Sequence, residues 1–165
     1  ADLGDELPTV VIVWRSELQT SWRAIHYLDV SDLAPLTALA ARFVCLQHDV
    51  STEERTTLDA IFGDRITFMD SIDLRDDFEE SAALVAALDL TIGVGTTMTN
   101  LSAAVGSPTL LLQTTHFGSW LATDERGTDF WYQSCTVLVA DPPYDTAALI
   151  SNTVDAGDQL LRTSR

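Results

Sequence analysis

The chain has 165 residues and 46% of them are hydrophobic, which suits one domain with a buried core. Its formal net charge is −16, and all nine basic residues are arginine. Nucleic acids and anionic membrane surfaces need a basic footprint, so this balance argues against both as partners. A small phosphate-bearing ligand is still compatible with the charge, provided that a few arginines and backbone N–H groups meet it.

We expect residues 1–7 to be the end of a linker and residues 8–165 to form a single domain. No apolar run approaches the length of a membrane span, so we expect no membrane insertion. Cys45 and Cys135 each lie in an apolar run and are expected to be buried free thiols. The histidines are scattered and show no metal-ligand spacing, and no metal or cofactor is expected.

Strand and helix patterns alternate through the first half of the chain. Apolar runs at 9–14, 42–47 and 66–69 lack alternation and predict strands covered on both faces. A polar loop is expected at 15–27. We predict a helix capped by Ser31 and Asp32, with leucines on one face, and a second helix to Phe62 opened by a capping box of Ser51 and Glu54.

The same alternation continues in the second half. An acidic connection at 70–80 leads into an alanine-rich helix predicted at 81–88. Residues 88–112 predict a strand, a glycine turn, a short helix and another strand. A last strand is predicted at 136–140, and Asp145 is expected to cap the final helix. This order predicts an α/β domain with a doubly wound, Rossmann-like parallel sheet and helices on both faces.

In such sheets, ligands bind outside the carboxyl ends of the strands. The loops at 15–27, 47–50 and 93–97 and the loop after Leu112 should lie there. The glycine turn precedes a helix whose free N–H groups and dipole favour an anion. Arg15, Arg23 and Arg126 are the available cations. Arg15 is our preferred phosphate contact, and a salt bridge with nearby acids is its alternative.

Several stretches, in this order, resemble one family: WRSELQTSWRAIHYLDVSDLAPL, RFVCLQHD, IDLRDDFEESAALVAALDLTIGVGTTMTNLSAAVGSPTLLL and FWYQS. The chain is similar, from about Pro8 to Leu161, to the carboxyl-terminal half of GT-B glycosyltransferases. The likeness is to the family nine, heptosyltransferase-like group, including domains that follow tetratricopeptide repeats in bacterial proteins. The resemblance implies a cytoplasmic donor-binding domain that binds a nucleotide-diphospho-sugar as substrate. It also implies a missing amino-terminal half, or a tetratricopeptide-repeat region, as partner.

The resemblance carries site residues onto two segments. Trp14, Arg15 and Ser16 match the family's first-loop motif, and a second group matches its strand-to-helix signature: Gly95, Thr96, Thr97, Met98 and Asn100. The family commonly has aspartate at the position of Gly95 and histidine at that of Asn100. From its place at a strand end, Gln47 could touch a base or ribose, with capping of the strand end as the alternative.

The sequence allows more than one interpretation of the chemistry. In GT-B folds the base that activates the acceptor usually comes from the other half, so no catalytic residue is assigned. Trp120, Trp131 and Tyr132 could stack on a ring or pack a long loop onto the body. The changes at Gly95 and Asn100 support an alternative, a catalytically degenerate module acting in ligand sensing or protein interaction. A dinucleotide-dependent oxidoreductase is disfavoured, because no G-x-G-x-x-G follows the first strand.

Overall fold

The computed structural model describes residues 7–117 and 122–163. The expected linker, except for Leu7, and Trp120 therefore lie outside the described residues. The core of the fold is one sheet of six parallel strands in the order β3-β2-β1-β4-β5-β6. The strands are β1 (Thr9–Val13), β2 (Arg42–Cys45), β3 (Ile66–Phe68), β4 (Leu90–Val94), β5 (Thr109–Gln113) and β6 (Cys135–Val139).

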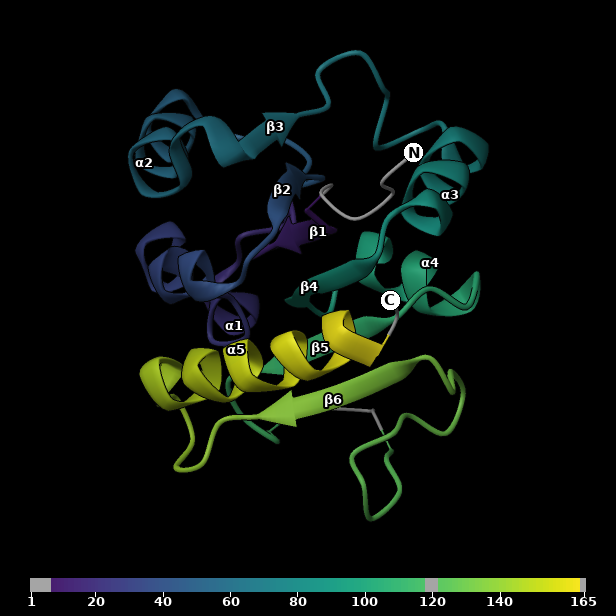
Figure 1. The fold of residues 1–165 in the computed structure, drawn as a ribbon. Helices are drawn as coiled ribbons and strands as arrows, with labels where there is room; N and C mark the ends of the chain where they lie inside the picture. Colours follow the sequence, from purple (N-terminus) through teal and green to yellow (C-terminus); the bar gives the residue numbers. More distant parts are fainter. Residues whose placement is uncertain (1–6, 118–121, 164–165) are drawn as a thin grey trace.

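Helices cover both faces of this sheet (Figure 1). The helices are α1 (Ser21–Ala24), η1 (Val30–Ala38), α2 (Thr52–Phe62), η2 (Gly63–Arg65), α3 (Phe78–Ala87), α4 (Thr97–Ala104) and α5 (Thr146–Thr163). On one face η1 packs against both α2 and α5, and on the other face α3 packs against α4. The predicted doubly wound, Rossmann-like fold is confirmed. The chain order changes direction between β1 and β4, which is where such sheets bind ligands.

The strands carry the two apolar faces of the sheet. Val10, Ile12 and Trp14 point into the larger cluster, beneath η1 and α5. Val11 and Val13 alternate with them and join the cluster beneath α3 and α4. Burial on both faces explains why the sequence of β1 shows a continuous apolar run rather than alternation.

Most element boundaries match the sequence-based prediction, and the differences have local causes. The helix predicted from Ser31 is a 3-10 helix that begins at Val30, because Asp29 and Asp32 form its capping box. Pro35 lies inside it and has no N–H to donate. Helix α3 begins at Phe78, three residues before the predicted start, because Asp77 accepts the N–H of Glu80. The four-residue helix α1 was not predicted at all, since the segment reads as a polar loop.

Cys45 and Cys135 are free and buried, as predicted. Burial raises the pKa of each thiol to about 12, so both remain protonated at neutral pH.

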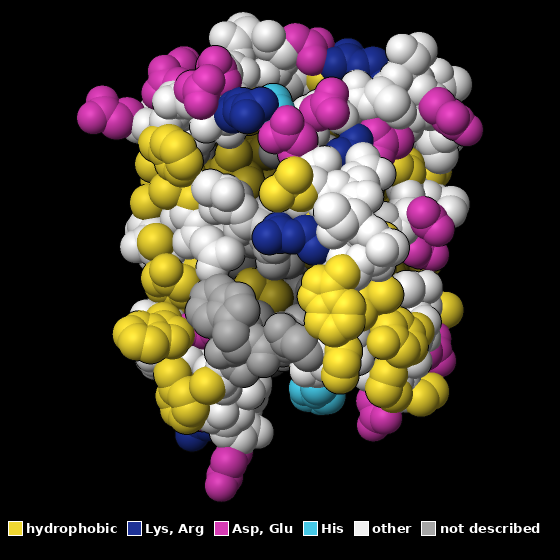
Figure 2. Space-filling model, turned by 180° about the vertical axis from the view of Figure 1, so that it is seen from behind, with side chains coloured by type: hydrophobic (Ala, Val, Ile, Leu, Met, Phe, Trp, Pro, Cys, Tyr) yellow, Lys and Arg dark blue, Asp and Glu magenta, His cyan; other side chains and the backbone are white. Residues whose placement is uncertain are grey.

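Within residues 7–117 and 122–163, no helix combines the length and apolar character needed to cross a membrane. Most acidic side chains on the face shown in Figure 2 lie toward the top of the view, and hydrophobic side chains lie on both sides of a central basic region.

Candidate functional site

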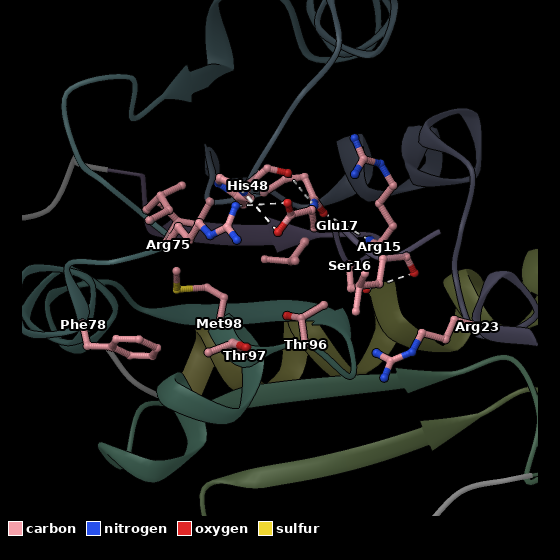
Figure 3. Close-up of a pocket in the computed structure, with 15 residues that line it drawn as sticks. Arg15, Ser16, Glu17, Arg23, His48, Arg75, Phe78, Thr96, Thr97 and Met98 are labelled. Carbon is pink, nitrogen blue, oxygen red and sulfur yellow. Dashed lines mark hydrogen bonds and ion pairs between the residues drawn. The ribbon is translucent and has the colours of Figure 1, made fainter. Parts of the chain in front are cut away.

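A cavity of about 260 Å³ lies at the carboxyl ends of β1, β2 and β4. Its walls come from the loop after β1, the end of β2, the segment before α3 and the first turn of α4 (Figure 3). The side chains and backbone that line it are Val13, Arg15, Ser16, Glu17, Leu18, Arg23, Leu46, Gln47, His48, Leu74, Arg75, Phe78, Thr96, Thr97 and Met98. The cavity therefore lies where the change in strand order places a ligand site.

The first turn of α4 offers unpaired donors to this cavity. Thr96 caps the helix: its N–H donates to Thr99 Oγ1 at 2.9 Å, and its own Oγ1 accepts the N–H of Thr99 at 3.4 Å. In the described part of the chain, the N–H groups of Thr97 and Met98 have no acceptor. These two amides and the positive end of the helix dipole make the turn suitable for an anion.

Arg15 does not present its guanidinium to the cavity. Its Nε and Nη2 donate to the two carboxylate oxygens of Glu54, each at 2.7 Å, and Nη2 also donates to the carbonyl of Asp49. The side chain is 8% exposed and points away from Thr96 (Figure 3). Arg15 is among the residues that line the cavity, but its guanidinium is held by Glu54 and Asp49, so its predicted phosphate contact stays a prediction that this pairing does not support.

The carboxylate of Glu54 accepts hydrogen bonds from several donors. Besides Arg15, it accepts the indole N–H of Trp14 at 3.0 Å and the backbone N–H of Ser51 at 2.8 Å. Burial acts to raise the pKa of this carboxyl, but these hydrogen bonds outweigh it and lower the pKa to about 2. The cluster fixes the end of β1 to the start of α2 and so shapes one wall of the cavity.

Trp14 and Gln47 also have structural partners. Trp14 is 1% exposed and belongs to the core, and it does not line the cavity. Gln47 Oε1 accepts the backbone N–H groups of Trp14 and Arg15 at 3.2 and 3.1 Å, and its amide donates to the carbonyl of His48. Gln47 thus caps the strand end, which is the alternative that the sequence left open, while its side chain still borders the cavity.

Two arginines lie at opposite ends of the cavity (Figure 3). Arg23, on α1, is exposed, and its guanidinium makes no hydrogen bond or ion pair with a described residue. Arg75, in the segment before α3, donates to Glu17 at 3.1 Å. His48 Nε2 lies 3.9 Å from the other oxygen of Glu17. Among the residues that the structure describes, Arg23 thus has no partner at this cavity, whereas Arg75 is engaged in a surface ion pair.

A shallower groove of about 510 Å³ continues from this cavity along α4. The two share Ser16, Arg23, Phe78, Thr96 and Thr97, and the groove adds Gly95, Asn100, Leu101, Ala104 and Tyr132. The Asn100 amide donates to the carbonyl of Thr96 at 2.7 Å, so it braces the turn of α4. Predicted site residues on α4 are therefore divided between the cavity and the groove.

Between β5 and β6, the described residues contribute little to either hollow. Trp131 is 75% exposed and does not pack onto the body, whereas Tyr132 packs against a core cluster and borders the groove. Arg126 is exposed and lines neither hollow.

The structure brings most predicted site residues together and adds others that the sequence did not reveal. The loop after β1, the end of β2 and the turn into α4 bring together Ser16, Gln47, Thr96, Thr97 and Met98 at the cavity. Glu17, His48, Arg75 and Phe78 line it too but were not predicted. A lone arginine within the acidic stretch DSIDLRDDFEE was the only signal for Arg75, since no local pattern gives its distance to β1.

These features define the chain as a Rossmann-like α/β domain. Its cavity is suited to an anion and lies between β1 and β4, where the strand order changes direction (the strand switch). Solved structures of bacterial heptosyltransferases share this fold. E. coli WaaC with ADP aligns with a TM-score of 0.62 at 16% identity, over 96% of this chain and 45% of that chain. A second WaaC structure, with ADP-2-deoxy-2-fluoro heptose, gives 0.58 at 13%, over 93% and 44%.

A glycosyl transferase of family 9 from Veillonella parvula gives a TM-score of 0.58 at 10% identity, over 98% of this chain and 48% of that chain. Protein FlbA of Caulobacter vibrioides is 33% identical over 137 residues, which are 81% of this chain and 22% of FlbA. The chain thus spans less than half of each solved structure and about a fifth of FlbA. No protein-family profile matches it.

Proposed function

We propose that this chain is the donor-binding domain of a glycosyltransferase and binds a nucleotide-diphospho-sugar in the cavity at the strand switch. The observation that carries the proposal is the convergence of Arg23 with the unpaired N–H groups of Thr97 and Met98 at one cavity. Helix N-termini and cationic side chains are the groups that stabilise a leaving diphosphate without a metal ion. The likeness to WaaC, solved with ADP and with an ADP-heptose analogue, supports the class of ligand.

The cavity and the groove suggest how such a ligand divides. The diphosphate lies at the first turn of α4, between Arg23 and Arg75, because the two hollows meet there. The nucleoside occupies the cavity, and the sugar extends into the groove beside Asn100. In this arrangement Arg15 stabilises the wall through Glu54, and Arg23 takes the role of phosphate contact.

A substitution of Arg23 tests whether this residue contacts the phosphates. Replacing Arg23 with glutamine removes a charge-assisted hydrogen bond to phosphate, so we expect affinity for a nucleoside diphosphate to fall about tenfold to hundredfold. Calorimetric titration of ADP, UDP, GDP and their sugar conjugates into both proteins measures the change. The matched control is Arg126→Gln, which makes the same change in net charge at an exposed arginine outside the cavity.

Two results would count against the proposal. The first is that no nucleotide binds the unmodified chain at millimolar concentration. The second is that Arg126→Gln weakens binding as much as Arg23→Gln, which would reduce the effect to overall charge.

A second candidate function is a module that binds the ligand without transferring it. Position 95 offers no side chain, and the amide of Asn100 is held by the carbonyl of Thr96. Gly95 and Asn100 therefore do not supply the aspartate and histidine that are common at these positions in the glycosyltransferase family that the sequence resembles. Release of nucleotide from the bound donor by the natural full-length polypeptide, in the presence of candidate acceptors, distinguishes the two functions. Binding without any release favours the module.

A further inference from the structure

We propose that Glu17 is a built-in competing anion, which occupies Arg75 until a phosphate-bearing ligand displaces it. The inference rests on the proposed function, because it concerns the same cavity. Glu17 is the only carboxylate among the described residues that line this cavity. Its two oxygens face Arg75 and His48, which come from two other segments of the chain (Figure 3).

The geometry of the segment before α3 holds Arg75 in reach of the cavity. The carboxylate of Asp73 accepts the backbone N–H groups of Arg75 and Asp76, each at 3.0 Å. This turn fixes the backbone at Arg75, and its side chain then reaches Glu17 at 3.1 Å. Glu17 and Arg75 lie 58 residues apart in the sequence, so their contact joins the loop after β1 to the segment before α3 across the cavity.

A ligand can readily displace the ion pair between Glu17 and Arg75, because both side chains are exposed. The side chains of Arg75 and Glu17 are 58% and 46% exposed, whereas those of Arg15 and Glu54 are 8% and 19% exposed. An exposed pair with one hydrogen bond is weak, because water screens both charges. A phosphate group offers several acceptor oxygens and greater charge, so it competes with a single carboxylate for the same guanidinium.

The consequence is a cost in affinity for ligands that bind Arg75. Such a ligand must replace the interaction with Glu17, whereas a neutral sugar or a nucleoside that leaves the ion pair intact need not. Glu17 therefore lowers the affinity of the cavity for phosphate-bearing ligands and leaves the affinity for neutral ligands unchanged.

The experiment is a set of calorimetric titrations with pyrophosphate and ADP as probes. We expect Glu17→Gln to tighten binding of both probes by about fivefold, the upper range of a surface ion pair. Glu79→Gln is the matched control, because Glu79 is exposed at the start of α3 and lies outside the cavity. It should tighten binding much less. In a chain that carries Arg75→Gln, the further change Glu17→Gln should add no more than the control does.

Three other results would overturn the role of Glu17, and one of them would also reject the proposed function. Equal effects of Glu17→Gln and Glu79→Gln on a wild-type chain that binds ADP would overturn the role of Glu17 and leave the donor site standing. Weaker binding of ADP with unchanged binding of pyrophosphate would also overturn it, since Glu17 would then contact the nucleoside. Failure of both probes to bind the wild type and Glu17→Gln would reject the proposed function, and the role of Glu17 with it.

Discussion

Replacing Gly93 with alanine is expected to destabilise the domain by about 3 kcal/mol or more, the upper range for overpacking a tight core. Gly93 lies in β4, and a Cβ at this position would be 2.5 Å from the carbonyl oxygen of Val13 and 2.9 Å from Thr99 Cγ2. Both neighbours are fixed, one by the β1 ladder and one by the cap of α4. The backbone must therefore shift, and the first turn of α4 shifts with it.

Gly95 provides the matched control, two residues away. A Cβ there meets nothing within 4 Å, and its backbone is not in the left-handed region. Gly95→Ala should therefore change the free energy of unfolding by less than about 0.5 kcal/mol. Urea unfolding followed by circular dichroism measures both variants. Equal stability of the two variants would show that β1 and β4 are less closely packed than described.

Replacing Glu54 with alanine is expected to lower the free energy of unfolding by about 3 kcal/mol, the cost of breaking a largely buried ion pair. The change leaves the guanidinium of Arg15 without its carboxylate in a side chain that is 8% exposed. It also removes the acceptor of the Trp14 indole and of the Ser51 N–H. Glu53→Ala is the control, since Glu53 also lies in the first turn of α2 but is exposed. A similar loss from both would reduce the effect to the helix dipole.

The pKa of Glu54 adds a test by pH. In the folded chain this pKa lies at about 2, below its ordinary value of 4.5. The stabilisation from the ionised carboxylate is complete above the ordinary value and is lost as the pH falls toward the folded value. The stability difference between wild type and Glu54→Gln should therefore shrink as pH falls from about 5 to about 2. A constant difference over this range would contradict the assigned pairing.

Glu54 also shows how far the sequence predicts this fold. The pattern of Ser51 and Glu54 predicts a capping box, and the structure has one, because a cap depends on residues only three apart. The pairing of the same carboxylate with Arg15 spans 39 residues and has no local pattern. Apolar runs likewise predict the strands and the sheet class, since burial on both faces leaves a mark in each segment.

The candidate site likewise combines features that local sequence predicts with contacts between distant segments that it does not predict. Predicted residues at the strand ends converge because the topology brings every carboxyl end to one edge of the sheet. What each side chain does there depends on its neighbours. Arg15 was the preferred phosphate contact because it follows a buried strand directly, but a partner from α2 holds it. Glu17 and Arg75 meet across a cavity that no single segment encodes.

We propose above all that the first turn of α4 and the loop after β1 hold the phosphates of a nucleotide. Amide chemical-shift mapping during titration with ADP or UDP tests it most directly, because each backbone N–H reports on its own surroundings. We predict that the largest shifts fall on Thr97 and Met98, with smaller shifts at Ser16 and Thr96. No shift at millimolar nucleotide, or shifts confined to residues outside the cavity and the groove, would contradict the account.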